Sequence, residues 1–466
     1  MIFENVIIIT DYIALVYSLM MYIVFFIFVI SSALSFSKYI KSREAISQLN
    51  LDDSSEYIPV SLIVPSYNEE VTIVSTIESL ISLNYEEYEI IIVNDGSTDN
   101  TLEILKKEYN LNLIYKPMKK IIDTKDIKGV YKGRIRNKDI ILIDKENGGK
   151  ADALNVGINY SKYPVFVSID ADSLLEKNAI QKIIIPFMEN KKTVAVGGNI
   201  KISNFIEIID GEVINHNKLK GILIPFQIIE YLRAFLTNRM AWNSLNMNLI
   251  ISGAFGAFNK KIVTEVGGYK TNTVGEDMEL VMRIHKYFLN KKEKYYIAFA
   301  PDANCYTQTP DTLKGLKTQR RRWQMGLIQS INNHKDMFID KKWFLAKSYF
   351  IFFELITPIL ELFGMVIITI SFFIGLINLD FLLIYYLTIM IYSTLVSISA
   401  ILLDIYVFKE NINIKITTKL IVLSIFESIG YRQLISLYRI SAFIGYSKNK
   451  HKWGSIKRKV QNKTTA

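Results

Sequence analysis

The sequence contains few of the residues that build disulfides and zinc sites. Cys305 is the only cysteine, and there are four histidines among 466 residues. An intramolecular disulfide and a cysteine zinc site are therefore excluded, and the few histidines form no metal-ligand cluster. Cys305 is expected to be a small, partly buried residue. The P-loop pattern is also missing, which argues against a kinase or an ATPase.

Hydrophobic residues, by contrast, are abundant. They make up 50% of the sequence, and the mean hydropathy is +0.21, above ordinary soluble usage. This composition indicates an integral membrane protein. The net charge is +10, but the basic residues are dispersed and lie largely beside apolar segments. Membrane flanks and a phosphate-bearing substrate explain this charge, so membrane lipids are expected partners and nucleic acid is not.

The first apolar run, residues 12–36, contains no charged residue and is long enough to cross a bilayer. Acidic residues precede it, and basic residues follow it at Lys38, Lys41 and Arg43. This order of charges differs from that of a cleaved signal peptide and places the basic flank in the cytoplasm. Residues 1–37 are therefore predicted to form a retained N-terminal membrane anchor.

A C-terminal membrane region is predicted over residues 341–446. Its two long apolar runs, 347–377 and 381–408, indicate a hairpin that returns to the cytoplasm. Residues 419–446 carry arginines that would each cost ~2.5–3.5 kcal/mol at the centre of a bilayer. They are predicted to form an amphipathic helix at the cytoplasmic face or inside the bundle, and residues 447–466 a basic cytoplasmic tail. The whole pattern is typical of a multi-pass protein of the plasma membrane.

Two carboxylates, Glu354 and Glu361, interrupt the first of these C-terminal runs near Pro358. Seven residues apart, they are expected on nearly one helical face. One interpretation is a short interfacial helix that leads into the span. The other is a polar lining for a passage, since ionisable groups in membrane helices usually face protein or water.

Residues 57–340 are predicted to form a cytoplasmic α/β domain with a mainly parallel sheet, because apolar runs of strand length alternate with helix-like stretches. Polar residues that suit a ligand site follow these runs at Asn68, Asp95, Lys150, Asp170 and Asp172. Open α/β sheets bind ligands outside the carboxyl ends of their strands, so these residues are expected to meet in one crevice. The lysine-rich stretch 117–138 is expected to be a surface insertion.

Three of these motifs have a local chemistry of their own. Asp95 in VNDGSTD suits a plain turn and helix cap. SIDADS places Asp170 and Asp172 so that both can approach one hard cation, Mg²⁺ or Mn²⁺, which takes further ligands from substrate phosphates. Lys150 in NGGK lies just before a helix, where exposed amides and a cation suit a phosphate.

The segment VGEDM places Asp277 at a loop-to-helix junction. It is either a helix cap or a general base that takes the proton of an acceptor hydroxyl. His285, further along the same helix, is expected to be a capping or surface residue rather than a ligand.

The motif QRRRW places Gln319, Arg322 and Trp323 on one face of a helix. Arginine can grip phosphate and tryptophan can stack on a sugar, but the same residues also make an ordinary interfacial anchor. Interfacial helices are predicted at about residues 222–247 and 312–335.

The ordered set PSYNEE, VNDGSTD, NGGKADALN, DAD, GED and QRRRW, over roughly residues 57–335, resembles membrane-bound inverting glycosyltransferases of family 2. This group includes cellulose, hyaluronan and poly-N-acetylglucosamine synthases. The resemblance implies a Rossmann-like GT-A fold with Asp277 as the base and a metal at Asp170 and Asp172. It also implies that the nucleotide-sugar is bound by Asn68, Asp95, Lys150, Asp170, Gln319, Arg322 and Trp323.

The leading hypothesis is a processive synthase that extends a β-linked polysaccharide from a UDP-sugar at the cytoplasmic face and passes it outward. UDP-glucose and UDP-N-acetylglucosamine are the expected donors. One alternative is a non-processive enzyme that adds one or a few sugars to a lipid acceptor, and another is a non-catalytic transport or assembly subunit. The chain has fewer clear spans than cellulose synthases, which leaves room for an accessory export subunit.

Overall fold

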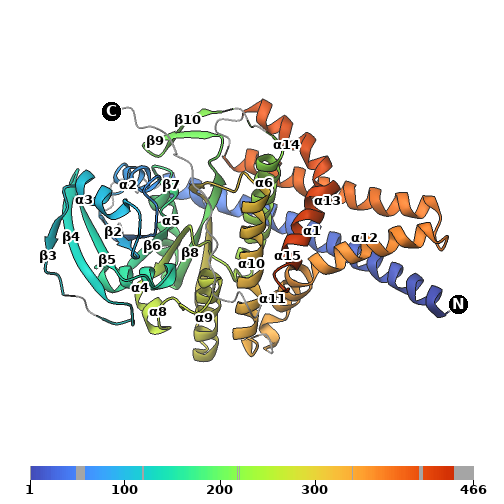
Figure 1. Cartoon of the computed structure of the whole chain (residues 1–466), viewed down its shortest axis with the longest axis horizontal. Coiled ribbons are helices and arrows are strands. Elements are labelled where there is room, and N and C mark those ends of the chain that lie inside the picture. The colour runs from blue at the N-terminus through green and yellow to red at the C-terminus, as the bar shows by residue number, and fades with distance from the viewer. Residues whose placement is uncertain are drawn as a thin grey trace. The chain divides into compact units, whose positions relative to one another are not determined.

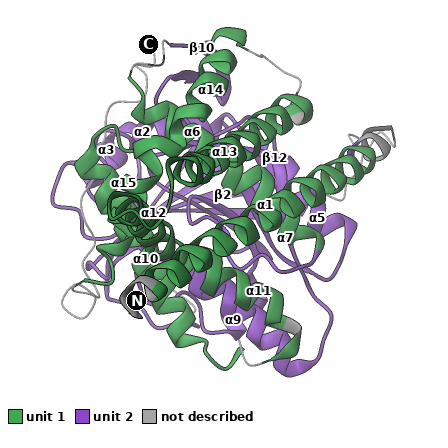
Figure 2. Cartoon of the chain, turned by 90° about the vertical axis from the view of Figure 1, so that its right-hand side faces the viewer, with its two compact units in different colours: residues 1–42, 219–244, 310–454 green, residues 43–218, 245–309, 455–466 purple. Residues whose placement is uncertain are grey.

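The computed structural model describes residues 2–48, 58–117, 120–217, 219, 221–337, 340–408 and 413–444. They form two compact units, coloured separately in Figure 2. The sheet unit lies within residues 43–218 and 245–309, and the helical unit within residues 1–42, 219–244 and 310–454. The predicted tail 447–466 lies outside the described residues. The domain boundaries drawn from the sequence stay a prediction.

The sheet unit is built on a ten-stranded sheet with the order β3-β4-β5-β2-β1-β6-β11-β8-β12-β7 (Figure 1). The strands are β1 (Val60–Ser66), β2 (Tyr88–Asn94), β3 (Asn112–Ile114), β4 (Ile127–Ile135), β5 (Lys138–Lys145), β6 (Val165–Ile169), β7 (Ser173–Leu175), β8 (Thr193–Ile202), β11 (Phe255–Asn259) and β12 (Tyr296–Thr307). Strands β4, β7 and β11 run against the other seven. The predicted mainly parallel α/β sheet is therefore confirmed. A separate ribbon pairs β9 (Ile206–Ile209) with β10 (Glu212–His216).

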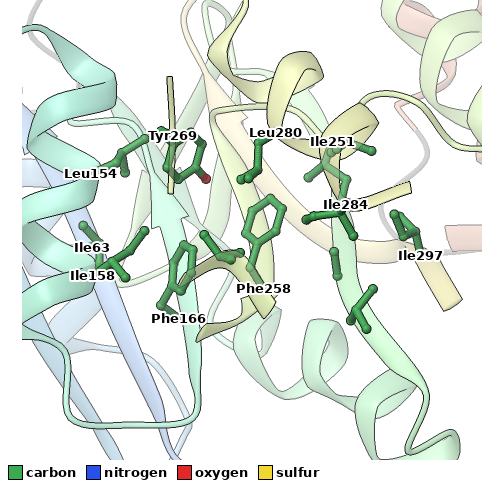
Figure 3. Close-up of a cluster of buried hydrophobic side chains, with 14 of the residues drawn as sticks. Ile63, Leu154, Ile158, Phe166, Ile251, Phe258, Tyr269, Leu280, Ile284 and Ile297 are labelled. Atoms are coloured by element: carbon green, nitrogen blue, oxygen red, sulfur yellow. The ribbon is translucent and has the colours of Figure 1, made fainter. Parts of the chain in front are cut away.

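Helices of the sheet unit fix the ends of the central strands. They are α2 (Ile73–Ile81), α3 (Thr101–Glu108), α4 (Lys150–Tyr160), α5 (Ala179–Glu189), α8 (Lys260–Glu265) and α9 (Glu276–Lys291). β1 and β2 are buried along their whole length, as near-continuous apolar runs of a covered sheet should be. In the cluster of Figure 3, Leu154 of α4 and Leu280 of α9 pack with Ile63, Phe166 and Phe258 of the sheet. Each such burial contributes ~1.5–3 kcal/mol, which fixes the starts of α4 and α9 against the sheet.

Two expectations about the sheet unit need correction. The lysine-rich stretch 117–138 is not simply a surface insertion, because its residues Ile127–Ile135 form β4 and pair with β3 and β5. His285 is not a surface or capping residue. Its ring is fully buried and bonds to the Tyr295 hydroxyl at 2.6 Å and to the Asn248 carbonyl at 2.8 Å.

The helical unit comprises α1 (Ile2–Gln48), α6 (Leu223–Leu232), α7 (Met240–Ser244), α10 (Leu313–Asn333), α11 (Phe344–Ser348), α12 (Thr357–Phe373), α13 (Leu379–Phe408), α14 (Ile414–Phe426) and α15 (Arg432–Ile440). Short segments η2 (Arg233–Arg239), η4 (Lys341–Trp343), η5 (Tyr349–Leu355) and η6 (Glu427–Tyr431) connect several of them. One apolar cluster joins Phe226 and Ile229 of α6 and Leu316 of α10 to Ile401 of α13 and Leu420 of α14. The segments predicted as interfacial helices therefore pack directly on membrane-type helices.

Three helices of the described chain are long and apolar enough to cross a membrane. Ile7–Arg43 contains the predicted span 12–36, Leu379–Tyr406 covers the predicted span 381–408 except for its last two residues, and Ile414–Ile440 is the third. The predicted run 347–377 is not one continuous helix, since Phe344–Leu355 and Thr357–Phe373 are bent by 49°. Pro358 explains the break, because it has no backbone N–H to continue the preceding helix and suits the first turn of a new one.

The segment Ile414–Ile440 is interrupted as well. Ile429 and Gly430 have non-helical backbone angles, with φ of 92° at Gly430, a value that glycine adopts readily. The placement predicted for residues 419–446, an amphipathic helix at the cytoplasmic face or inside the bundle, stays a prediction.

The bend at Ile356 separates Glu354 from Glu361, so the single helical face expected for them does not exist. Both carboxylates instead have arginine partners on α15: Arg439 Nη2 lies 3.3 Å from Glu354, and Arg432 Nε lies 3.9 Å from Glu361. Arg439 also donates from Nε to Gln324 of α10 at 2.7 Å. The short helix α15 therefore ties α10 and both halves of the broken helix together.

Candidate active site

The loop after β2 is held by contacts between motifs that lie far apart in the sequence. Both Asp95 carboxylate oxygens accept from the NGGK loop, at 2.9 Å from the Gly148 amide and 2.7 Å from the Gly149 amide. On the other side, Asn68 Oδ1 accepts from the Thr98 amide at 2.8 Å. Asp95 is 3% exposed, so these bonds give it a structural part in holding the NGGK loop. Its contact with a nucleotide stays a prediction.

A buried lysine that the sequence reasoning missed stabilises this loop. Lys145 ends β5, is fully buried, and forms ion pairs with Asp95 at 2.5 Å and Asp152 at 2.6 Å. The Lys145 ammonium offsets one of the two carboxylate charges, and backbone amides that donate to Asp95 and to Asp152 stabilise the remaining charge. The available signal was a lone cation at the carboxyl end of the apolar run DIILIDK.

The next residue group surrounds the ammonium of Lys150 at the start of α4. Its Nζ lies 2.5 Å from Asp170 Oδ1 and 3.6 Å from Glu276, and donates to the Gly253 carbonyl at 3.2 Å. Burial opposes the charge, but Asp170, Glu276 and Asp277 outweigh it and raise the pKa of Lys150 above its usual value. Lys150 therefore stays protonated, a fixed cation among carboxylates.

Asp277 lies in the first turn of α9, beside this lysine. Its Oδ2 accepts from the Gly253 amide at 3.1 Å, and its Oδ1 from its own helix at Met278 N, at 2.8 Å. The helix N-terminus favours the negative charge. A Cβ at Gly253 would lie 2.9 Å from Lys150 Nζ and 3.5 Å from Asp277 Oδ2, so a residue without a side chain allows the two groups to approach.

Asp170 and Asp172 occupy the turn between β6 and β7. The Asp170 side chain is 31% exposed, whereas Asp172 is 3% exposed. Thr76 holds the turn by donating to the Ala171 carbonyl at 2.8 Å. Behind it, burial raises the pKa of the Cys305 thiol, and Asp170 and Asp172 add to the effect. Cys305 is thus fully buried rather than partly buried, and it remains a neutral thiol.

The two carboxylates fit a divalent cation that is shared with a substrate. Within the described ranges, no three His, Cys, Asp or Glu side chains are placed to hold a metal by themselves. Mg²⁺ and Mn²⁺ commonly use one or two carboxylates and complete their shell with phosphate oxygens and water, and the partly exposed Asp170 suits that use. The metal assignment stays a prediction.

The QRRRW residues lie in α10, in the helical unit. Gln319 is 9% exposed and Trp323 is 44% exposed, with Arg322 intermediate. The structure thus gathers Lys150, Asp170 and Asp277 around Gly253, and Asn68 beside the Asp95 loop. The three motif residues of α10 form a second group within the other unit.

The Rossmann-like sheet, with acidic residues and a lysine following its parallel strands, defines the GT-A class of fold. A family model described as "Glycosyl transferase family 2" matches residues 61–210, and one described as "Glycosyl transferase family group 2" matches residues 165–403, more than half of the chain. The chain therefore belongs to glycosyl transferase family 2.

Several curated proteins resemble the chain. It is 32% identical to a poly-beta-1,6-N-acetyl-D-glucosamine synthase of Staphylococcus aureus (strain COL) over 302 residues, 65% of this chain and 62% of that protein. A synthase of the same description from Staphylococcus epidermidis is 32% identical over 268 residues, 57% of this chain and 54% of the relative. The chain thus matches less than two thirds of the length of these relatives.

One solved structure shares the fold. It is a mannosyltransferase from Pyrobaculum calidifontis in complex with GDP-Man and Mn²⁺, at a TM-score of 0.50 and 14% identity. The match covers 95% of this chain and 99% of that one. At this identity the likeness concerns the fold alone.

Proposed function

We propose that the chain polymerises a β-linked polysaccharide from a UDP-sugar at the cytoplasmic face of the membrane and passes the product outward. The observation that carries this proposal is the grouping of Asp277, Lys150 and Asp170 around Gly253 in a family 2 glycosyltransferase. The names of the relatives favour UDP-N-acetylglucosamine over UDP-glucose as the donor.

The reaction proceeds with inversion at the anomeric carbon. Asp277 takes the proton of the acceptor hydroxyl as that oxygen forms its bond to the sugar. The bond between the anomeric carbon and the diphosphate oxygen breaks, and the electron pair leaves with UDP. The Gly253 amide holds one Asp277 oxygen in place, which leaves the carboxylate oriented for this transfer.

The second requirement of the reaction is to neutralise the negative charge on the departing diphosphate. Lys150 supplies one fixed cation, held by Asp170 and the Gly253 carbonyl. Asp170 and Asp172 would hold Mg²⁺ or Mn²⁺, which when bound neutralises phosphate charge. Asn68 and Asp95 shape the neighbouring loop for the nucleotide, and Gln319, Arg322 and Trp323 contact the donor or the growing chain.

Export draws support from charged and hydroxyl side chains inside the helical unit. They line a cavity of about 50 Å³ together with apolar residues, and include Tyr17, Tyr22, Arg233, Glu361, Ser393 and Arg432. This space is far smaller than the roughly 300–1,000 Å³ of a typical small-ligand pocket. Passage of a sugar chain would therefore need the helices to separate, alone or with an accessory export subunit.

The test is glycosyl transfer by the full chain in nanodiscs, with labelled UDP-N-acetylglucosamine, UDP-glucose and other donors, in the presence of Mg²⁺ or Mn²⁺. High-molecular-mass polymer is expected. The variant Asp277→Asn should lose transfer by on the order of 10²–10⁴-fold, the range of a general base. The matched control Asp123→Asn removes a fully exposed carboxylate of the same unit and should leave transfer unchanged.

Other products would contradict parts of the proposal. Short glycolipids alone would show a non-processive enzyme with a lipid acceptor. No turnover of any donor, with Asp277→Asn leaving cellular function intact, would show a transport or assembly subunit instead.

A further inference from the structure

Arg320 is the most enclosed residue of QRRRW, although the family resemblance assigns roles only to Gln319, Arg322 and Trp323 of this motif. It is 2% exposed, against 9% for Gln319 and 44% for Trp323. Long cationic side chains are seldom fully buried unless they are paired, so its burial calls for a physical reason.

One guanidinium contacts two motif side chains at once. Arg320 Nη1 donates to Gln319 Oε1 at 2.5 Å, and its Cζ lies 4.3 Å from the centre of the Trp323 ring. The first contact orients the Gln319 amide, because an arginine can only donate and so selects the carbonyl oxygen. The second is a cation–π contact that favours one orientation of the indole.

The second terminal nitrogen of the guanidinium is fixed from outside α10. Arg320 Nη2 donates to Glu230 Oε2 of α6 at 2.6 Å, and the Tyr431 hydroxyl donates to the same oxygen at 2.9 Å. Burial works against ionisation of Glu230, but Arg320 and Tyr431 outweigh it and lower its pKa. The Tyr431 ring in turn stacks on Phe226 of α6 at 4.9 Å between ring centres. Arg320 is therefore held by Glu230 of α6, which Tyr431 holds in turn.

We infer that Arg320 is a positioning residue that fixes the side chains of Gln319 and Trp323 for the donor or the growing chain. An ion pair between Arg320 and Glu230 that served stability alone would not need the contacts with Gln319 and Trp323. Apolar residues can often replace such a buried pair without loss of stability. The planar fork and the flat cationic face explain the choice of arginine, because lysine offers neither. The activity part of this inference rests on the proposed function.

A double-mutant cycle tests the inference in the full chain in nanodiscs. Arg320→Gln, Arg320→Lys and Glu230→Gln are measured alone and combined with Trp323→Phe. Arg320→Gln is expected to lower kcat for transfer by on the order of tenfold to hundredfold, as misplaced groups do. In the Trp323→Phe background the same change should cost far less, because the two residues act together. Lys317→Gln, which removes an exposed cation from the same helix, should change nothing.

A second readout does not depend on activity. The fluorescence difference between the native chain and Trp323→Phe isolates the Trp323 signal, and its quenching by acrylamide reports how accessible the indole is. Quenching should increase in Arg320→Gln and in Glu230→Gln. It should increase much less in Arg320→Lys, because the lysine still provides a positive charge for Glu230.

The outcomes separate the two proposals. Fully multiplicative losses in the cycle, or unchanged quenching in both Arg320→Gln and Glu230→Gln, would overturn the positioning role. If Arg320→Gln does not fold, Arg320→Lys and Glu230→Gln decide by the same criteria. If the native chain transfers no sugar, the proposed function fails, while the quenching measurement still tests the positioning of Trp323.

Discussion

The variant Gly253→Ala tests the close approach of Lys150 and Asp277 to the Gly253 backbone. The added methyl would lie 2.9 Å from Lys150 Nζ, closer than real Cβ contacts, and 3.5 Å from Asp277 Oδ2, an ordinary contact. The lysine end must shift by a few tenths of an ångström, against its bonds to Asp170 and the Gly253 carbonyl. Gly253 does not have a positive φ, so alanine can adopt its backbone.

The magnitude follows from these distances. Glycine to alanine at a compatible site stabilises by about 0.4–1 kcal/mol through the unfolded chain, which roughly offsets the cost of moving a flexible lysine end. Stability should therefore change little. The displaced Lys150 cation should slow transfer by on the order of tenfold to hundredfold, which is about 1.4–2.7 kcal/mol of activation free energy.

Initial rates of transfer over a range of UDP-N-acetylglucosamine, together with thermal unfolding in nanodiscs, check both expectations. The control Gly197→Ala adds the same methyl to β8, where the nearest atom, on Ile251, is 3.4 Å away. Unchanged kcat/KM in Gly253→Ala would refute the reasoning that the Lys150–Asp277 geometry controls the reaction. A fall in the unfolding midpoint large enough to explain the lost activity would refute it too.

Three further predictions follow from separate features. Removal of divalent cations with EDTA should stop transfer, and Mn²⁺ or Mg²⁺ should restore it; full activity in EDTA would contradict a metal at Asp170 and Asp172. Because burial raises the pKa of Cys305, N-ethylmaleimide at roughly pH 8 should label the thiol slowly in the folded chain and quickly in denaturant; mass spectrometry detects the difference, and equal rates would contradict burial. Arg432→Glu should lower the unfolding midpoint, and the added change Glu361→Arg should restore part of it; absence of rescue would show that the pair contributes little.

Much of the sheet unit was predictable because its strands are continuous apolar runs with a polar residue directly after each. Asp95 and Asp170 directly follow β2 and β6, and Lys150 begins the helix after β5, so their local positions could be read from the sequence. The parallel pairing of β1, β2, β5 and β6 follows from burial on both faces. By contrast, β4 alternates lysines with apolar residues, which indicates an exposed segment as well as a strand.

The residues that were missed depend on contacts between distant segments. The burial of Lys145 requires Asp95 and Asp152, and that of His285 requires Tyr295 and Asn248. The role of Arg320 likewise depends on Glu230 of another helix. Periodicity and composition describe one segment at a time, so they do not reveal such partners.

The apolar cluster formed by Phe226, Ile229 and Leu316 with Ile401 and Leu420 has a practical consequence. A fragment that stops before α11 would keep the first three side chains but lose their cover on α13 and α14. The apolar surface that becomes exposed in this fragment would favour aggregation. Trimming away the hairpin is therefore a poor route to a water-soluble enzyme, and biochemical work on this chain should begin with a lipid-supported, full-length preparation.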